Sequence, residues 1–449
     1  CIRDSSRAVE QIEVEYEPLP VVSDPVQSHN PEAPQIHSSG NLLKHIKVRK
    51  GDVDSGFRNS DVVIEHTFHT AITDHAFMEP ECSIARLTSE GCMEIYVGSQ
   101  IPYADRNQVA RTLDWPEERV RIRGQLMGGG FGGKEDIAGQ IHAALLTEKT
   151  GQPVKLLFDR HESLIAHPKR HGTQIRVKMG AKKDGRLTAI ETELYGDTGA
   201  YASLGEKVMT RATTHSSGPY DMPHTKADCY AMYTNNPPAG AFRGFGVTQS
   251  AFAVESMMDM LAEKLELDPI AIRYQNALRI GSVTNTGQEL GNSVGLIECI
   301  ERVEAEMTRI TGDTPFVPIV VPGAEHLRRS WGFAVGYKNT GLGGGAPDKA
   351  EAEVELYTNG SLQVRSSSAE LGQGLVTVLQ MIVAEEFNQP LESVNVLVMD
   401  TALTPDGGPT TASRQTFVTG NAALHAARTL RQAIVSSLAE KYDQSPDTI

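Results

Sequence analysis

The stretch Gly128-Gly-Gly-Phe-Gly-Gly-Lys-Glu135 places five glycines in six consecutive positions. A loop without side chains lets backbone N–H groups approach an anion closely. Residues 136–150 follow, with Ile137, Ile141 and Leu145 at helical spacing. A glycine loop that leads into a helix is typical of an anion-binding cradle. An ordinary glycine-rich turn between two elements is the alternative.

The two common nucleotide loops fit this stretch poorly. A P-loop carries Ser or Thr after its lysine, whereas Glu135 follows Lys134 here. Gly128, Gly130 and Gly133 match the spacing of the dinucleotide fingerprint, but no clear acid ends a following strand. The loop therefore indicates an anion site of another kind, and a protein that binds ordinary nucleotides is a less favoured alternative.

Composition indicates a globular protein of more than one domain. The chain has 449 residues, and single cores stop growing at roughly 250–300. Its net charge of −15 argues against a nucleic-acid surface. No apolar run approaches the roughly 20 residues that span a bilayer. The five cysteines include no C-x-x-C pair, which argues against an iron–sulfur cluster or structural zinc in this chain and favours a reducing, cytoplasmic setting.

Strand-like and helix-like runs interleave, which predicts an α+β fold with two mixed α/β domains. We expect the tail of a preceding domain and a linker over 1–34, a first domain over 35–305, a linker over 306–330 and an incomplete second domain over 331–449. Strands are predicted at 12–16, 62–68, 83–87, 93–97, 175–179, 187–194, 333–337, 352–357, 362–366 and 394–399. Helices are predicted at 136–150, 248–266, about 374–387 and 420–441. Lys183-Asp-Gly-Arg186 supplies a hairpin turn.

Three further segments offer hydrogen-bond donors in compact loops. They are Gly240-Ala-Phe-Arg-Gly-Phe-Gly246, Glu370-Leu-Gly-Gln-Gly-Leu375 and Thr410-Thr-Ala-Ser-Arg-Gln-Thr416. Each alone is more simply an ordinary turn. Four such loops from both predicted domains suggest a large polar cofactor held at the domain interface.

The order of these segments resembles that of a known family. Ser99-Gln100, then residues 128–135, 240–246, 370–375 and 410–420, follow one another as in the molybdenum hydroxylases of the xanthine dehydrogenase/aldehyde oxidase family. The match covers nearly the whole chain and indicates the molybdopterin-binding subunit. The resemblance implies a molybdenum ion on molybdopterin, extended in bacterial members by a nucleotide such as cytosine dinucleotide.

The resemblance also assigns roles by position. Gln100 corresponds to the glutamine that lies over the metal. The residues that line the metal or hold the pterin correspond to Gly129, Gly130, Phe131, Phe242, Arg243, Gly372, Gln373, Gly374, Ala412, Ser413 and Arg414. No side chain is expected to ligate the metal directly. His75 and Glu79 make an incomplete metal set, so we predict a hydrogen-bonded structural histidine.

The implied reaction is hydroxylation of a substrate carbon with water as the oxygen source. Purine-oxidising members carry a glutamate at the position of Glu135 and an arginine at that of Arg211, and members that act on aldehydes tend to lack this pair. A facing carboxylate and guanidinium could bind an N-heterocycle and stabilise charge on its ring, and Phe131 and Phe245 could sandwich it. We therefore expect Gln100, Glu135 and Arg211 to be catalytic. The alternative is that Glu135 caps a helix and pairs with Arg211, and that Phe245 is a core residue.

Partner chains follow from the same resemblance. Electrons leave such a site through iron–sulfur clusters and FAD, which we expect on separate subunits. The family's catalytic base is a glutamate near the C-terminus, and nothing after Thr416 matches it. We therefore expect a central piece whose C-terminal cofactor-binding part is separate or removed, and which alone is inactive and need not hold the cofactor. A non-catalytic scaffold or an aldehyde oxidoreductase subunit is the alternative.

Overall fold

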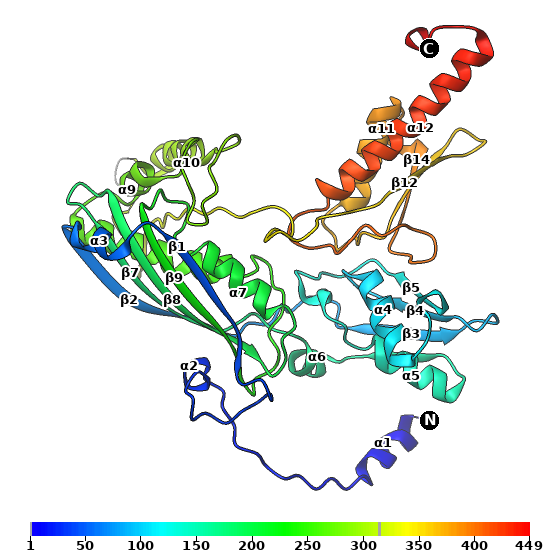
Figure 1. The fold of residues 1–449 in the computed structure, drawn as a ribbon, viewed down its shortest axis with the longest axis horizontal. Helices are drawn as coiled ribbons and strands as arrows, with labels where there is room; N and C mark the ends of the chain where they lie inside the picture. The colour runs from blue at the N-terminus through cyan, green and yellow to red at the C-terminus, as the bar shows by residue number, and fades with distance from the viewer. Residues whose placement is uncertain (1, 313–315) are drawn as a thin grey trace.

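The computed structural model describes residues 2–312 and 316–449, and it confirms the α+β class (Figure 1). The helices are α1 (Ile2–Glu10), α2 (Pro25–Ser28), α3 (Val53–Arg58), α4 (Pro102–Leu113), α5 (Gln140–Thr150), α6 (Arg160–Ala166), α7 (Gly205–Thr214), α8 (Val247–Leu265), α9 (Pro269–Asn276), α10 (Leu296–Thr311), α11 (Leu375–Phe387) and α12 (Val418–Tyr442). The strands are β1 (Leu42–Lys50), β2 (Val62–Thr70), β3 (Cys82–Leu87), β4 (Met93–Val97), β5 (Val120–Gly124), β6 (Val154–Leu157), β7 (Thr173–Ala181), β8 (Leu187–Gly199), β9 (His224–Tyr233), β10 (Ile319–Val321), β11 (Ala324–Arg329), β12 (Glu353–Leu356), β13 (Leu362–Ser366) and β14 (Val394–Val398). In the described residues, no helix is long and apolar enough to cross a membrane.

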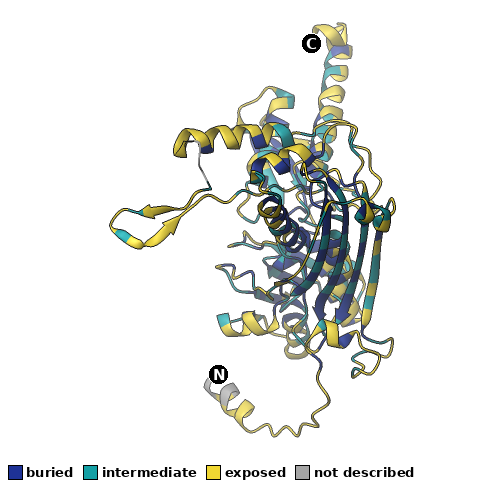
Figure 2. Cartoon of the chain, turned by 90° about the vertical axis from the view of Figure 1, so that its left-hand side faces the viewer, coloured by how far each residue is buried: buried dark blue, intermediate teal, exposed yellow. Residues whose placement is uncertain are grey.

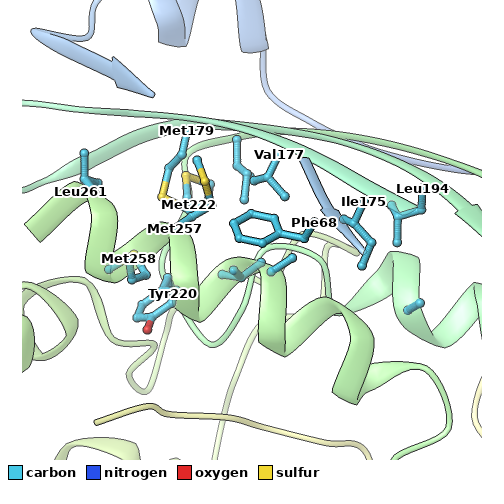
Figure 3. Packing of buried hydrophobic residues seen from close by; sticks show 14 of the residues in the cluster. Phe68, Ile175, Val177, Met179, Leu194, Tyr220, Met222, Met257, Met258 and Leu261 are labelled. Atoms are coloured by element: carbon cyan, nitrogen blue, oxygen red, sulfur yellow. The ribbon is translucent and has the colours of Figure 1, made fainter. Parts of the chain in front are cut away.

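The largest sheet has five strands in the order β1-β9-β8-β7-β2. Alternate residues of β7, including Ile175, Val177 and Met179, are buried on one face, as period-2 patterning requires. Met257 and Leu261 of α8 pack against that face (Figure 3). The predicted hairpin turn at 183–186 joins β7 to β8, which pair antiparallel.

A four-stranded sheet, β5-β4-β3-β6, builds one side of the candidate site. β4 and β5 are parallel and α4 connects them, so they form a βαβ unit. The carboxyl ends of parallel strands meet at the same edge of a sheet, where ligands of such units bind. Gln100 follows β4 and the loop 128–135 follows β5, so topology alone places these two segments together.

A three-stranded sheet, β12-β13-β14, repeats this arrangement in the second half of the chain. β13 and β14 are parallel and joined through α11, so residues 367–374 and 399–416 lie beyond one edge. This edge is joined to the end of β5. The Gly124 N–H donates to the Met399 carbonyl at 2.6 Å, and Arg121 pairs with Asp400 at 2.6 Å. The carboxyl ends of the two βαβ units therefore face each other.

Several elements differ from the sequence-based expectations. Residues 333–337 form no strand; Val335 N–H donates instead to the Glu255 carboxylate of α8 at 2.9 Å. Residues 12–16 are not paired with any strand of the described residues, so the alternation of apolar and polar residues was not enough to form a strand. The helix predicted to begin at 136 begins at Gln140. The predicted linker 306–330 contains the end of α10 and the hairpin β10–β11, which projects from the body with most of its residues exposed (Figure 2).

Candidate functional site

Four loops make up the candidate site, and each is named here by a feature of its sequence. They are the glycine loop (128–135), the arginine loop (240–246), the glutamate loop (370–375) and the hydroxyl loop (410–416).

Gln100 is the residue that joins the two halves of the site. Its side-chain Nε2 donates to the Thr410 carbonyl at 2.7 Å, and its Oε1 accepts from the Gly132 N–H at 3.1 Å. Its backbone N–H donates to the Lys134 carbonyl, and its carbonyl accepts from the Thr410 N–H, both at 2.9 Å. Gln100 is 2% exposed, so these contacts fix its amide in one orientation. The predicted meeting of Gln100, the glycine loop and the hydroxyl loop is present.

Gly130 marks the closest approach between these segments. A Cβ placed at Gly130 would lie 2.6 Å from Gln100 Oε1 and 3.4 Å from a methyl carbon of Leu371. Any side chain at this position would collide with the glutamine. The glutamate loop, through Leu371, is thus the third predicted loop at this point.

The arginine loop packs beside the glycine loop. The Arg243 N–H donates to the Phe131 carbonyl at 2.8 Å. The Phe242 ring lies between His75, with ring centroids 4.0 Å apart, and the Arg170 guanidinium, 3.8 Å from the ring. The Arg243 side chain is exposed, and no hydrogen bond or ion pair of its guanidinium is found among the described residues. Arg243 is therefore the charged group of this loop that remains open to a ligand.

The donors of the glutamate loop are not free, contrary to the sequence-based expectation. The Glu370 carboxylate accepts from the N–H groups of Gly372, Gly374 and Val376, at 2.8, 3.1 and 3.0 Å. The Gln373 amide bonds within its own loop, accepting from Leu371 N–H at 2.6 Å and donating to a carbonyl at 2.9 Å. Any ligand contact at Gly372 and Gly374 must therefore use their open glycine faces, because a Cβ there would meet no atom within 4 Å.

The hydroxyl loop carries strained backbone and a structural arginine. Ala412 and Ser413 adopt φ values of 51° and 55°, which non-glycine residues rarely adopt. Arg414 was predicted to hold the cofactor, but its side chain is 0% exposed. Its guanidinium bonds the Asp348 carboxylate and the carbonyls of residues 349, 407 and 409. That prediction is wrong for the side chain, which organises the loop from within and cannot touch a ligand.

Glu135 and Arg211 do not pair with each other in the structure. Burial, with a smaller contribution from Asp136, raises the pKa of the Glu135 carboxyl to about 8, although a hydrogen bond from Thr411 and the charge of Lys207 oppose the shift. The Arg211 guanidinium donates instead to the Leu342 carbonyl at 2.5 Å. Within the described residues no ion pair joins Glu135 to Arg211, contrary to the alternative in which the two side chains pair directly. That they face a substrate from two sides stays a prediction.

The two aromatic rings predicted to contact a flat substrate differ in their surroundings. Phe131 is 46% exposed with a φ of 54° and is available to a ligand. Phe245 packs against the core of the five-stranded sheet, as its alternative interpretation proposed. None of the aromatic pairs found in the described part of the chain joins the two rings.

Sequence reasoning missed several residues that shape the site. The Glu79 carboxylate accepts from Gly128 N–H at 2.5 Å and lies 3.4 Å from Lys134 Nζ, so it joins both ends of the glycine loop. Glu370 was interpreted only as part of a cradle, although an acid just before a helix start is a known capping signal. Gly341-Leu-Gly-Gly-Gly345, which meets Arg211 through Leu342, has four glycines in five positions, and this signal was available in the sequence.

The residues present fit a large polar cofactor. Four non-glycine loop residues, Phe131, Phe245, Ala412 and Ser413, adopt positive φ, and such strain clusters at functional sites. The groups that converge here are the backbone of the glycine and arginine loops, held together beside Gln100, and they are neutral apart from the exposed Arg243. Neutral donors suit oxo and phosphate oxygens. No group of three or more possible metal-ligating side chains is found in the described residues.

Comparison with known proteins identifies the family. Residues 36–277 match one model of a molybdopterin cofactor-binding domain, and residues 322–449 match a second. The chain belongs to the molybdopterin-binding subunits of the xanthine dehydrogenase/aldehyde oxidase family. It is 34% identical over 434 residues to a probable xanthine dehydrogenase subunit of Bacillus subtilis (strain 168), covering 97% of this chain and 57% of that protein.

Two other relatives bear on the substrate. The chain is 44% identical over 307 residues to the nicotinate dehydrogenase large molybdopterin subunit of Eubacterium barkeri, covering 68% of this chain and 72% of that protein. The solved aldehyde oxidoreductase of Desulfovibrio gigas superposes with a TM-score of 0.87 and 29% identity, over 96% of this chain and 47% of that one. The chain thus spans about half the length of the aldehyde oxidoreductase. These relatives are oxidoreductases, and the first two are named as subunits.

Proposed function

We propose that this chain supplies cofactor- and substrate-facing residues of a molybdenum hydroxylase that oxidises an N-heterocycle with water as the oxygen source. The observation that carries the proposal is the position of Gln100. Its amide contacts the glycine loop and the hydroxyl loop, and it lies beside Leu371 of the glutamate loop. When bound, molybdopterin with molybdenum, as such or as the cytosine dinucleotide, supplies the two-electron oxidation and the oxygen transfer.

The chain's own residues have separable roles in this proposal. Gln100 holds the glycine loop and the hydroxyl loop together through its amide, and the backbone of Gly129, Gly130 and Phe131 approaches the cofactor without side-chain obstruction. Arg243 and the open faces of Gly372 and Gly374 extend the contact to the pterin and its phosphates, as do the backbone groups of Ala412 and Ser413. Gln373 acts by shaping its loop.

Glu135 supports a heterocyclic substrate. With a pKa of about 8, its carboxyl is largely protonated at pH 7 and can donate a hydrogen bond to a ring nitrogen or ring oxygen. Arg211 is half-buried, and no carboxylate pairs with it among the described residues. Exchanging the Leu342 carbonyl for a substrate oxygen would place the Arg211 charge on the ring. The likeness to the nicotinate dehydrogenase subunit also favours a nitrogen heterocycle.

An aldehyde is the second candidate substrate. Two observations favour it: the Arg211 guanidinium is bonded to the Leu342 carbonyl, and the fold superposes on an aldehyde oxidoreductase. An aldehyde needs no ring contact from either residue.

The test uses the complex that contains this chain, isolated whole, with iron–sulfur and FAD subunits as the partners proposed. Molybdenum and pterin nucleotide are quantified, and a purine, nicotinate and an aromatic aldehyde are assayed in ¹⁸O-labelled water. We expect bound molybdenum, ¹⁸O in a heterocyclic product, and a loss of about 100-fold in kcat/KM for the heterocycle in Glu135→Gln, with the aldehyde rate nearly unchanged. Absence of molybdenum would favour a scaffold, and oxidation of the aldehyde alone would select the second candidate.

A further inference from the structure

A chain of three buried ionisable side chains lies behind the glycine and arginine loops. His167 Nδ1 lies 2.9 Å from a Glu81 carboxylate oxygen, and His167 Nε2 lies 2.9 Å from His75 Nδ1. His75 Nε2 lies 2.7 Å from the carbonyl oxygen of Ala241 in the arginine loop. The three side chains are between 2% and 8% exposed, so water does not compete for these contacts.

The position of each proton follows from the partners. A carbonyl oxygen only accepts, so His75 Nε2 carries a hydrogen and donates it to Ala241. Burial and the positive charge of His167 lower the pKa of His75 to about 3, so its ring is neutral and its Nδ1 is an acceptor. His167 Nε2 must then donate to His75. Each hydrogen bond of the chain therefore has one defined direction, from His167 to His75 and from His75 to Ala241.

The Glu81 end completes the assignment. Burial would raise the pKa of Glu81, but hydrogen bonds, from His167 above all, outweigh burial and lower it. The Glu81 carboxylate lies 2.9 Å from His167 Nδ1, within ion-pair distance. This contact anchors the chain at the end remote from the loops.

The two imidazole rings also fill the space between the loops. A Cβ at Gly133 of the glycine loop would lie 2.6 Å from the His167 ring. The His75 ring packs on Phe242 of the arginine loop. The hydrogen bond that joins the two loops directly, from Arg243 N–H to the Phe131 carbonyl, therefore has the packed rings of two histidines behind it.

We propose that His75 and His167 are positioning residues that set the separation between the glycine loop and the arginine loop. They hold the backbone of Phe131 and Arg243 where the cofactor is received, without touching it themselves. The consequence for the cofactor rests on the proposed function, whereas the consequence for loop geometry does not.

The primary test is amide hydrogen exchange of the complex, followed in peptides that contain the Arg243 N–H. His75→Phe keeps a ring of similar size but removes the donor, and His75→Gln retains one donor and one acceptor. His161→Phe, at an exposed position of α6, is the matched control. We expect exchange at Arg243 to accelerate about tenfold in His75→Phe, the effect of one lost hydrogen bond, with partial rescue in His75→Gln and no change in His161→Phe.

Exchange in β8 serves as the fold control in every variant. Unchanged exchange at Arg243 in a folded His75→Phe protein would overturn the proposal. If Phe at this position prevents folding, His75→Gln and His167→Gln carry the test, with the same expectation of faster exchange confined to the two loops.

Molybdenum content supplies the second readout. We expect His75→Phe to retain less molybdenum per chain than His161→Phe. A wild-type complex without molybdenum would contradict the proposed function, and the exchange at Arg243 would still decide this inference. Wild-type molybdenum content in a variant with faster loop exchange would overturn the link from loop separation to cofactor retention.

Discussion

The glycine loop and the glutamate loop are both rich in glycine, yet they use it for different physical reasons. In the glycine loop, a Cβ at Gly130 or Gly133 would lie 2.6 Å from a buried neighbour. In the glutamate loop, Gly372 and Gly374 meet nothing within 4 Å but adopt φ values of 99° and 84°. Gly130 and Gly133 are needed for close approach, whereas Gly372 and Gly374, like Gly129 and Gly132 of the first loop, are needed for a positive φ. Glycine density alone does not separate these two cases.

The two loops also differ in the pKa shift of the carboxyl group at one end of each. Glu135 ends the glycine loop, and burial raises its pKa to about 8. Glu370 begins the glutamate loop; burial opposes ionisation there, but backbone N–H groups of Val376, Gly374 and Gly372 lower its pKa. A carboxyl that lacks enough donors stays neutral, and one that collects donors stays charged.

Alanine substitutions at these glycines test the comparison, and one of them should give the largest change in the free energy of unfolding. Gly133→Ala drives a methyl group into the buried rings of His167 and Phe77 and should lower the free energy of unfolding by about 2–3 kcal/mol. Gly372→Ala meets no atom and should cost only the left-handed backbone strain, about 1 kcal/mol. Urea unfolding measures both. Equal costs, or the reverse order, would break the distinction between the loops.

Glu135→Gln tests the first acid. The unfolded carboxyl loses its proton near the ordinary glutamate pKa of 4.5, whereas the folded one keeps it to about 8. The folded state therefore binds more protons between these values, and wild-type stability falls as pH rises through this window. We expect Glu135→Gln to remove that slope and to be more stable than the wild type at pH 8. Glu148→Gln, at an exposed site on α5, is the control; a slope that survives in Glu135→Gln would contradict the assignment.

Glu370→Gln should show the opposite sign and a smaller effect. Because its pKa is lowered on folding, Glu370 stabilises the fold above the ordinary glutamate pKa of 4.5 and loses this contribution as pH falls through its lower folded value. We expect a loss of about 1 kcal/mol at pH 7, typical of a removed helix-terminal acceptor. Denaturation from pH 7 to pH 3 measures it against Glu385→Gln. A cost that does not shrink at low pH would show that charge is not its origin.

Phe131→Gly should have the smallest effect on stability. Phe131 is the residue of the glycine loop that holds a positive φ with a side chain, and glycine relieves that strain while losing little buried area. The free energy of unfolding should change by less than about 0.5 kcal/mol. The KM for a flat substrate should rise while molybdenum content stays constant. A large loss of stability would show that the ring is part of the core.

Most of the elements predicted from local patterning are present, although α1–α4, α6, α7, α9, α10 and the strands β1, β5, β6, β9, β10 and β11 were not predicted. The limits of β4 agree residue for residue with the prediction, and α8, β13 and α11 begin or end within a residue or two of it. These segments have strong periodicity and clear breakers at their ends. The strand expected at 333–337 is not formed, and its Val335 N–H bonds the Glu255 side chain of α8 instead of a neighbouring strand. The extended run at 12–16 has the alternation of a strand but no sheet edge beside it.

The site was predictable in part, because the order of its loops matches a family. That match gave Gln100 and the glycine loop correctly as neighbours of the hydroxyl loop. The family match predicted that Arg414 contacts the cofactor, although the Arg414 side chain is fully buried in the structure. The position of the Arg211 guanidinium depends on its bond to the Leu342 carbonyl, and Leu342 lies 131 residues from Arg211 in the sequence.

The sequence by itself determined the α+β class, the family and the identity of the loops, because hydrophobic period, glycine density and motif order are local or linear properties. Tertiary structure decided which donors remain free, which acid is charged and which arginine is enclosed. These properties depend on burial and on partners far away along the chain. The facing of two βαβ edges, which brings Gln100 to Thr410 across 310 residues, is the physical reason that the site exists.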